Sequence, residues 1–414
     1  MIIFHIDANA AYLSWSAAAA LERGTGQDLR TIPSVVGGSQ ASRHGIVLAK
    51  SIPAKMRGIK TGESLFEARK KCPELVVVPP DYDLYMNCSD AMYRILAEYS
   101  PLIQRYSIDE CFMDYTASKQ RFGDPERVAK RIAFRMRTEL GFTVNIGISS
   151  NKLLAKMASE MEKPDRIHTL FPDEMPEKMW PRPVSDLFMV GRATAKKLAS
   201  VNVRTIGELA AIERRRLADM LKSHGEVIWR YANGIDCSPV IPNDRIVQKG
   251  IGNSMTIFYD VTDKSELNAY MLSLCERACT RLRAQKARTS RISVSYRTDT
   301  FLSRQHQRQL PFYVDETSKI YRIATELLSE CWMGEPVRQL GIGLGALSRV
   351  GQEQLSVFDV AHTGSDSVDA CVDRIRSRYG TDAVMRGIFA NTTLKPMEGG
   401  VNEGQFLTMG GYGL

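Results

Sequence analysis

The chain has 414 residues, of which 44% are hydrophobic and 25% are charged. This composition excludes a mainly disordered chain, and the length predicts two to four domains. No apolar run is long enough to cross a bilayer, which excludes a membrane-spanning helix, and the formal net charge of +8 favours a polyanionic partner.

The N-terminus and the cysteines are typical of a protein in a reducing compartment. The first residues include no basic segment, and Asp7 interrupts the apolar run, so no signal peptide is expected. The eight cysteines form no C-x-x-C pair, and they fit free thiols better than a disulfide framework or a zinc site. We therefore expect a cytoplasmic protein.

The first part of the chain alternates short apolar runs with amphipathic stretches. The apolar runs predict strands at 2–6, 35–36, 46–48, 75–78, 102–106, 111–115 and 142–148. The amphipathic stretches predict helices at 11–21, 63–72, 82–100, 125–140 and 151–162. The order strand, helix, strand, strand, helix, strand predicts a ferredoxin-like sheet with helices on one face.

A proline-rich stretch at 172–183 marks a domain boundary, and a second linker follows at 237–242. Between them, residues 184–233 predict short helices and no strand. Beyond the second linker, another β-α-β-β-α-β pattern occupies 249–347. The fold class is therefore α+β, with several domains.

Positive charge concentrates in the second β-α-β-β-α-β domain. Residues 245–308 hold twelve Lys plus Arg against five Asp plus Glu, a surplus of seven positive charges. In one strand there, apolar residues alternate with cationic or hydroxyl residues: Ile292, Val294 and Tyr296 with Arg291, Ser293, Ser295 and Arg297. An apolar inner face and a cationic outer face are expected.

This cationic face fits a surface that follows the phosphates of a nucleic acid, with a solvated basic face as the alternative. Few aromatic residues interleave with the cations, which argues against a single-strand binder that stacks bases.

Three acidic residues stand where the backbone turns. Asp7 ends the first strand, and Asp109 and Glu110 lie at the bend of a strand hairpin. Because the first and third strands of a ferredoxin-like sheet are neighbours, these carboxylates are expected to meet at one edge. Clustered carboxylates favour two Mg²⁺ ions about 3.5–4 Å apart, which would activate a hydroxyl and stabilise a leaving pyrophosphate. A purely polar turn at 109–110 is the alternative.

Two lysines are candidate triphosphate ligands, although a lone lysine is more often solvated. Lys55 lies in a turn-rich segment. Lys152 begins a helix for which Ser149, Ser150 or Asn151 is a natural N-cap, so free N–H groups and positive charge are expected to converge there.

Residues 190–198 resemble a helix-hairpin-helix, which presents backbone N–H groups to a DNA phosphate without reading bases. Met189 occupies the position of the usual first glycine, and an ordinary helix-turn-helix packing unit is the alternative. The candidate DNA-binding residues are Gly191, Arg192, Thr194, Lys196, Arg291 and Arg297.

Together, several segments resemble the Y-family translesion DNA polymerases, which include the UmuC-type and DinB-type bacterial enzymes. The segments are IDANAAYLSW, AKSIPAKMRGIKTGE, YSIDECFMDYT, GISSNKLLAKMAS and KGIGNSMTIF. The resemblance implies a multidomain right-hand polymerase with a ferredoxin-like palm, small fingers, a helical helix-hairpin-helix thumb and a β-α-β-β-α-β little finger. The implied boundaries are palm 1–18 and 76–168, fingers 19–75, thumb 169–238, little finger 245–350 and C-terminal tail 351–414.

The resemblance also implies roles for individual residues. Asp7, Asp109 and Glu110 match the catalytic metal ligands, and the carbonyl of Ala8 completes one site. Tyr12 matches the steric gate, whose ring excludes a 2′-hydroxyl; taken alone, it would more often be a core aromatic residue. The residues matched to triphosphate binding are Asn9, Ala10, Ala11, Tyr12, Lys55 and Lys152.

One segment departs from the common family pattern, and another resembles a protein-binding motif. The fingers carry Ile52 and Lys55 where many members have Tyr and Arg, as in the UmuC-type branch, and a lysine cannot make the bidentate phosphate contact of an arginine. Nucleotide affinity is therefore left open. After the last strand, a segment looks like a sliding-clamp-binding pentapeptide, with an amphipathic turn as the alternative: Gln354, Leu355, Ser356, Val357 and Phe358.

The implied function is error-prone translesion DNA synthesis in DNA repair and damage tolerance, including the SOS response. The implied cofactors are two Mg²⁺ ions, with Mn²⁺ as a substitute, and no proofreading activity is expected. The implied partners are primer-template DNA, deoxynucleoside triphosphates and a sliding clamp, with no membrane. We expect a monomeric bacterial protein associated with the nucleoid.

Three other classes of protein explain the sequence less completely. A non-catalytic scaffold of the same fold would have no need of its acids, yet Asp7, Asp109 and Glu110 are present. A nucleotidyl cyclase would explain the acids and the sheet but not the helix-hairpin-helix or the basic domain. A helix-hairpin-helix glycosylase would not explain the N-terminal acids.

Overall fold

The computed structural model describes residues 1–24, 26–39, 43, 45–349, 366–390 and 394–399. The chain divides into two compact units. The first comprises Met1–Gly37 and Ile46–Ile246, and the second comprises Gly38–Gly45 and Val247–Asn402. In the described part of the chain, no helix has both the length and the apolar character needed to span a membrane.

A five-stranded sheet forms the centre of the first unit. Its strand order is β5 (Ile103–Arg105), β6 (Glu110–Asp114), β1 (Ile3–Ala8), β7 (Val144–Ser149) and β8 (Ile167–Thr169). β1 pairs antiparallel with both β6 and β7, so the first and third strands of the predicted motif are neighbours, and the ferredoxin-like order is confirmed. The edge strand β8, which pairs parallel with β7, is an addition that the apolar pattern does not predict.

Helices cover both faces of this sheet. α4 (Tyr82–Ala97) and α6 (Pro125–Leu140) pack against Phe4 and Ile6 on one face. α7 (Lys152–Ser159) packs against β1 and β7 on the other face. The helices of the predicted motif, α4 and α6, therefore lie on one face as expected, and α7, which follows the motif's last strand, covers the other face.

A glycine makes room for α7. A Cβ atom at Gly147, in β7, would lie 1.9 Å from the carbonyl oxygen of Ala155 in α7, so only glycine lets strand and helix approach this closely. Because side chains alternate along a strand, Phe4 and Ile6 enter the core under α4 and α6, whereas His5 faces α7. The two faces of β1 therefore have different chemistry.

A smaller sheet lies in the same unit. Its strand order is β3 (Val47–Lys50), β2 (Ser34–Gly37) and β4 (Val76–Val78). α2 (Ile52–Met56) and α3 (Leu65–Lys71) share a compact apolar core with it, and α1 (Ala11–Glu22) follows β1. A single turn, α5 (Lys119–Phe122), precedes α6.

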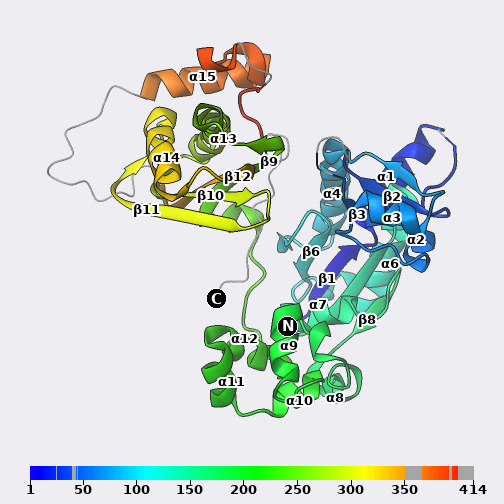
Figure 1. Cartoon of the computed structure of the whole chain (residues 1–414). Coiled ribbons are helices and arrows are strands. Elements are labelled where there is room, and N and C mark those ends of the chain that lie inside the picture. Colours follow the sequence, from blue (N-terminus) through cyan, green and yellow to red (C-terminus); the bar gives the residue numbers. More distant parts are fainter. Residues whose placement is uncertain (25, 40–42, 44, 350–365, 391–393, 400–414) are drawn as a thin grey trace. The chain divides into compact units, whose positions relative to one another are not determined.

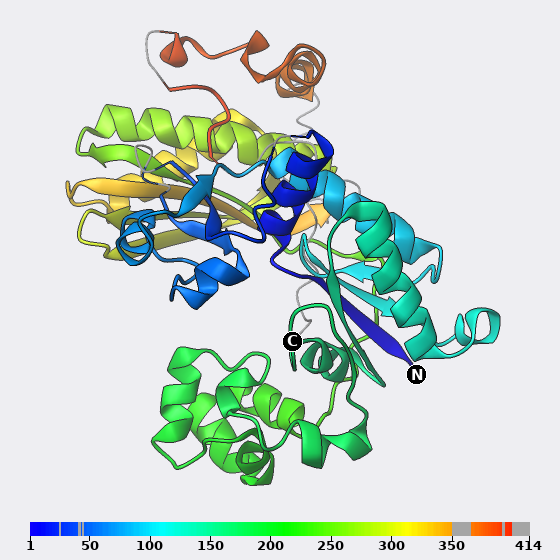
Figure 2. The same cartoon turned by 90° about the vertical axis from the view of Figure 1, so that its right-hand side faces the viewer.

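Short helices form the last part of the first unit and surround an apolar core of their own. They are α8 (Met175–Lys178), α9 (Arg192–Ala199), α10 (Ile206–Ala211), α11 (Arg214–Leu221) and α12 (Ser223–Ala232). Figure 2 draws α9 to α12 in green. Residues 172–246, all of them described, contain no strand, as the sequence predicts.

The second unit is built on a four-stranded antiparallel sheet. Its strand order is β11 (Ser303–Val314), β10 (Ala287–Thr298), β12 (Val337–Arg349) and β9 (Gly250–Val261). α13 (Lys264–Ala284) and α14 (Thr317–Cys331) cover one face. Ile292, Val294 and Tyr296 are buried, whereas Arg291 and Arg297 are exposed, so the predicted alternation is confirmed.

A further helix, α15 (Asp366–Tyr379), packs against the second unit, although the sequence pattern does not predict it. Figures 1 and 2 show α15 on the outer side of α13 and α14, away from the sheet. Two ion pairs hold it there: the buried Arg376 reaches Glu276 of α13 at 3.0 Å, and Arg283 reaches Asp373 at 2.6 Å in a half-buried pair. Part of the expected tail is therefore folded onto the preceding domain.

Candidate active site

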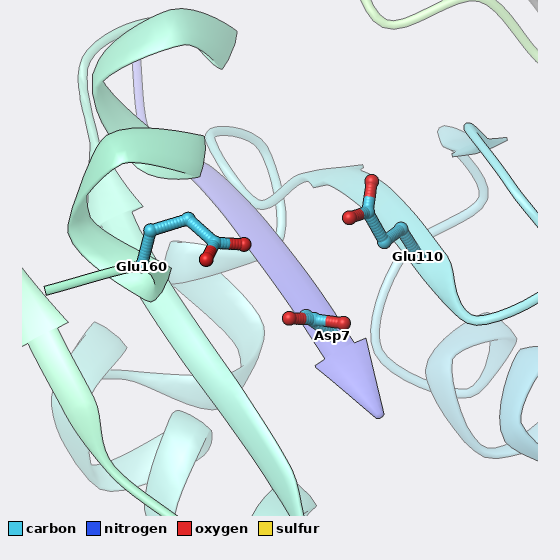
Figure 3. A group of neighbouring side chains, drawn as sticks. All are labelled: Asp7, Glu110 and Glu160. Atoms are coloured by element: carbon cyan, nitrogen blue, oxygen red, sulfur yellow. The ribbon is translucent and has the colours of Figure 1, made fainter. Parts of the chain in front are cut away.

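Three carboxylates converge at the end of β1. Asp7 is the register partner of Glu110 on β6, and Glu160 directly follows α7. Ligand oxygens of the three side chains lie within 4.8 Å of one another. Figure 3 shows Glu110 and Glu160 on opposite sides of Asp7, with the three carboxylates facing a common space. Hard divalent cations such as Mg²⁺ bind oxygen ligands of this kind.

Asp109 lies beside this group, but its carboxylate faces the hairpin. It accepts a hydrogen bond from the hydroxyl of Ser107, and its backbone carbonyl accepts one from the N–H of Ala8 at 3.0 Å. Burial raises the pKa of Asp109. The structure thus brings the predicted ligands Asp7 and Glu110 together, places Ala8 beside them, and leaves the Asp109 carboxylate outside the group of three.

Two lysines neutralise the acids. The Nζ of Lys156 donates to both carboxylate oxygens of Glu110 at 2.8 Å, and the side chain is 9% exposed. The Nζ of Lys163 contacts Asp7 and donates to Glu160 at 2.8 Å. Each lysine therefore places a positive charge where the acids need a cation.

Burial and these ion pairs set the charge states. Burial raises the pKa of Asp7 to about 7, and the ion pair with Lys163 offsets only part of that rise. Burial also acts to raise the pKa of Glu110, but His5 and Lys156 outweigh it and lower the pKa to about 2. Burial lowers the pKa of His5 to about 4, so its ring is neutral at pH 7. A cation bound beside Asp7 would favour its ionised form.

Lys152, the predicted triphosphate ligand, is buried and has polar partners of its own. Its side chain is 3% exposed, and its Nζ donates to Gln104 at 3.0 Å and to the carbonyl of Pro239 at 3.3 Å. Lys152 lies at the first turn of α7, whereas Glu160 follows the last. Its ammonium therefore fixes the segment after α12 to the sheet.

Tyr12 lies on the first turn of α1, close to the acids. Its ring stacks on Tyr85 with centroids 4.4 Å apart. Burial and the nearby Asp109 raise the pKa of Tyr12 to about 12, so the hydroxyl stays protonated. The predicted steric gate is thus near the carboxylates and braced from behind.

The N-terminus of α1 is open for an anion. Ala10, the N-cap, has the left-handed conformation (φ 47°) and no side chain that could cap the helix. The first N–H groups of a helix, here those of Ala11 and Tyr12, have no intrahelical acceptor. The backbone N–H of Asn9, another predicted phosphate donor, donates to the carbonyl of Thr143 at 3.0 Å in this structure.

The other predicted residues lie on elements other than those that carry the three carboxylates. Lys55 and Ile52 are exposed on α2, and Lys55 lowers the pKa of Lys50 in addition to the effect of burial. Gly191 is the N-cap of α9, without a side-chain cap, and Met189 adopts the positive φ (73°) that glycine usually supplies in such a hairpin.

The predicted DNA-binding residues on α9 and β10 are exposed or half-exposed. Arg192 and Lys196 are exposed on α9 and Thr194 is half-buried, while Arg291 and Arg297 lie on the outer face of β10. The predicted clamp-binding segment, residues 354–358, lies outside the described residues.

Sequence reasoning missed Glu160 and Lys163. Both follow α7, which contains Lys152, and the available signal was the pattern Glu-x-x-Lys at the end of the helix expected over 151–162. Their importance depends on which end of α7 approaches β1, and the periodicity of a helix does not specify that.

Three family models match the chain. The impB/mucB/samB family model matches residues 6–160, its C-terminal domain matches 248–357, and the helix-hairpin-helix motif of the same family matches 172–203. These matches span the acids of β1 and β6, the hairpin at α9 and the basic sheet. The chain belongs to the Y family of DNA polymerases, whose members are DNA-directed DNA polymerases.

Relatives of known name agree with this assignment along nearly the whole chain. The chain is 45% identical over 388 residues to DNA polymerase IV of Clostridium acetobutylicum, covering 94% of this chain and 98% of that protein. It is 36% identical over 400 residues to DNA polymerase IV 1 of Bacillus subtilis, covering 96% and 94%.

Solved structures share the fold. A Y-family DNA polymerase chimera of Dbh and Dpo4 matches with a TM-score of 0.71 and 19% identity, covering 84% of this chain and 100% of the chimera. The crystal structure of DinB from Sulfolobus solfataricus matches with a TM-score of 0.56 and 20% identity, covering 83% and 98%. The predicted architecture of palm, fingers, helical thumb and little finger is thereby confirmed.

Proposed function

We propose that this protein extends primers past damaged bases by template-directed, two-metal nucleotidyl transfer, without proofreading and therefore with low fidelity. The observation that carries the proposal is the meeting of Asp7, Glu110 and Glu160 at the end of the central strand. The relatives named DNA polymerase IV support the same reaction class.

The residues present fit divalent cations. The donor set consists of carboxylates, with the backbone of Ala8 at the same strand end, and such oxygen donors suit Mg²⁺. The ammonium groups of Lys156 and Lys163 contact the carboxylates that a divalent ion would need. Asp7 and Glu110 would hold the ions, together with Asp109 once its carboxylate turns from Ser107 toward them. The ions would neutralise charge and activate the primer hydroxyl.

The chain's own groups orient the incoming nucleotide. The uncapped N-terminus of α1 offers the N–H groups of Ala11 and Tyr12 to a phosphate, where the helix dipole also favours negative charge. The ring of Tyr12 lies on the same helical turn. The first turn of α1 would therefore contact both the phosphates and the sugar of the nucleotide. Lys163, whose side chain is 35% exposed, can turn from Asp7 to a phosphate oxygen when a divalent ion takes its place.

Primer-template DNA would be held by backbone and charge rather than by base reading. The hairpin at Gly191 presents the open N-terminus of α9, and Arg291 and Arg297 add cations on the sheet of the second unit. Lys55 on α2 is exposed and is proposed to reach the triphosphate from the fingers. The sliding clamp would bind residues 354–358, whose pattern is Gln, aliphatic, small, aliphatic, Phe.

The test is single-nucleotide addition to a primer-template with Mg²⁺, on undamaged and abasic templates. Wild-type protein should extend both, whereas Asp7→Asn and Glu110→Gln should abolish addition and still bind the DNA. Asp114→Asn is the matched control, because Asp114 lies at the opposite end of β6 and its carboxylate accepts a hydrogen bond from the local N–H of Thr116. DNA binding without addition by the wild type would refute catalysis and favour a scaffold.

Clamp binding needs a separate test. Replacing Leu355 and Phe358 with Ala should reduce clamp binding and clamp-stimulated synthesis, while synthesis without clamp stays unchanged. A normal clamp response in that variant would refute the proposed segment without touching the polymerase assignment.

A further inference from the structure

Lys156 is enclosed at the floor of the active site. It lies on α7, and only 8% of the residue is exposed. Its Nζ donates to both oxygens of the Glu110 carboxylate at 2.8 Å. The same nitrogen lies 5.2 Å from the ring centre of Tyr106 and 5.5 Å from that of Phe188. A carboxylate and two aromatic rings therefore surround this ammonium, and each of them favours a cation.

The ring of His5 approaches Glu110 from a second side. The Nε2 of His5 lies 3.6 Å from a Glu110 oxygen, and the Nδ1 of His5 lies 2.7 Å from the Ser159 hydroxyl. That hydroxyl in turn donates to the backbone carbonyl of Lys156 at 2.8 Å. The Ser159 hydroxyl thus connects the His5 ring to the turn of α7 that carries Lys156, and this fixes the backbone from which the ammonium reaches Glu110.

Lys163 differs in each of these respects. Its side chain is 35% exposed, against 9% for Lys156, and its two carboxylate partners, Asp7 and Glu160, come from different elements. An exposed ammonium can exchange one ion pair for another at small cost. A buried ammonium loses all its favourable contacts when it leaves its partner. A divalent ion should therefore displace Lys163 but not Lys156.

We propose that Lys156 is a positioning residue that holds the Glu110 carboxylate in its metal-binding orientation and stays in place when the divalent ion binds. This inference rests on the proposed two-metal function. The proposal predicts a change in metal affinity on removal of Lys156 that is opposite in sign to the change expected from charge repulsion alone. If the lysine merely competed with the metal, its removal would raise metal affinity. If the lysine orients a metal ligand, its removal lowers metal affinity.

The test is Mn²⁺ binding to the complex of protein and primer-template, measured from the electron paramagnetic resonance signal of free Mn²⁺. Lys156→Met keeps the length of the side chain and removes its charge. We expect it to weaken Mn²⁺ binding about tenfold or more. Lys163→Met is the matched control, and it should bind Mn²⁺ at least as tightly as the wild type. Unchanged or tighter binding by Lys156→Met would overturn the proposal.

A double-mutant comparison shows whether Lys156 acts through Glu110. In a Glu110→Gln background, the added Lys156→Met substitution should cause no further loss of Mn²⁺ affinity, because the carboxylate that Lys156 orients is gone. An equal loss in both backgrounds would mean that Lys156 acts by another route, and would overturn the assignment.

A second variant covers the case in which Lys156→Met does not fold. Phe188→Leu removes one aromatic face and leaves Lys156 and Glu110 intact, so Mn²⁺ affinity should fall by about two- to fivefold. Unchanged affinity would overturn the role of the enclosure. Failure of the proposed function is distinguishable, because it would appear as absent nucleotide addition by the wild type, whereas Mn²⁺ binding is read without turnover.

Discussion

Tyr12 and Tyr85 lie face to face, with ring centroids 4.4 Å apart and planes 9° from parallel. Tyr85 is completely buried, and its hydroxyl lies 3.0 Å from that of Ser16. Tyr82 meets both rings edge-on. The ring expected to exclude a 2′-hydroxyl therefore packs on a fixed support, and its position depends on Tyr85, which is itself buried away from solvent.

Replacing that backing should weaken sugar selection. Tyr85→Leu removes the stacked ring, so Tyr12 gains freedom, and discrimination against ribonucleotides should fall about two- to tenfold, in line with the energy of an aromatic pair. The measurement is the ratio of kcat/KM for a deoxynucleotide to that for its ribonucleotide. Tyr85→Phe keeps the stack and should retain selectivity. Equal selectivity in Tyr85→Leu and wild type would contradict the bracing.

The meeting of Asp7 and Glu110 followed from sequence order alone. In a β-α-β-β-α-β sheet the first and third strands are neighbours, and one residue ends the first strand while the other begins the third. Register then brings the two carboxylates together. The same reasoning correctly placed the alternating faces of β10, because a period of two needs no knowledge of tertiary packing.

The lysines could not be assigned in this way. A lysine in the first turn of a helix is a good candidate for phosphate binding, but whether it can reach a phosphate depends on where that end of the helix lies in the fold. Gly147 admits α7 to the face opposite α4 and α6, and this places the end of α7, with Glu160 and then Lys163, beside Asp7. Lys152, at the other end, meets Gln104 instead. The packing of α7 against the sheet determines the roles of these lysines. The local sequence pattern does not specify that packing.

Gly147→Ala tests this packing directly. The new Cβ would meet the carbonyl of Ala155, so α7 must move away from β7, and the free energy of unfolding should fall by about 3 kcal/mol or more. The shift would also separate Lys156 from Glu110, and nucleotide addition should decline with it. Gly191→Ala is the control for stability, because its Cβ meets nothing within 4 Å and it should unfold like the wild type. Matching losses in both variants would contradict the close approach.

His5 should make stability depend on pH. Burial lowers its pKa from 6.5 to about 4, so the unfolded chain binds a proton more readily than the folded one. The free energy of unfolding should therefore fall as the pH drops from about 6.5 to about 4, by about 3 kcal/mol in total.

The comparison with His5→Gln isolates this effect. Denaturant unfolding of both proteins at several pH values gives the difference in unfolding free energy. The raised pKa of Asp7 acts in the opposite direction, but it is present in both proteins and largely cancels in the difference. The advantage of wild type over variant should shrink as the pH falls through the window. Parallel profiles would show that His5 is not held neutral.

The fold of the second unit should depend on the ion pairs under α15. Glu276 is 3% exposed and accepts from Arg376 at 3.0 Å and from Arg386 at 2.8 Å, and Arg376 is itself 7% exposed. Glu276→Gln leaves the buried arginine without its counter-charge, which should lower the free energy of unfolding by about 3–5 kcal/mol. Limited proteolysis should then cut α15 faster, because the helix has lost its anchor.

An exposed ion pair in the same unit provides the contrast. Glu330 of α14 pairs with Arg308 at 2.5 Å, but the two side chains are 46% and 35% exposed, so Glu330→Gln should cost no more than about 1 kcal/mol. If both substitutions cost the same, and proteolysis of α15 is unchanged in Glu276→Gln, then α15 is held by its apolar contacts alone. If only Glu276→Gln releases α15, the buried pair is what joins this helix to α13.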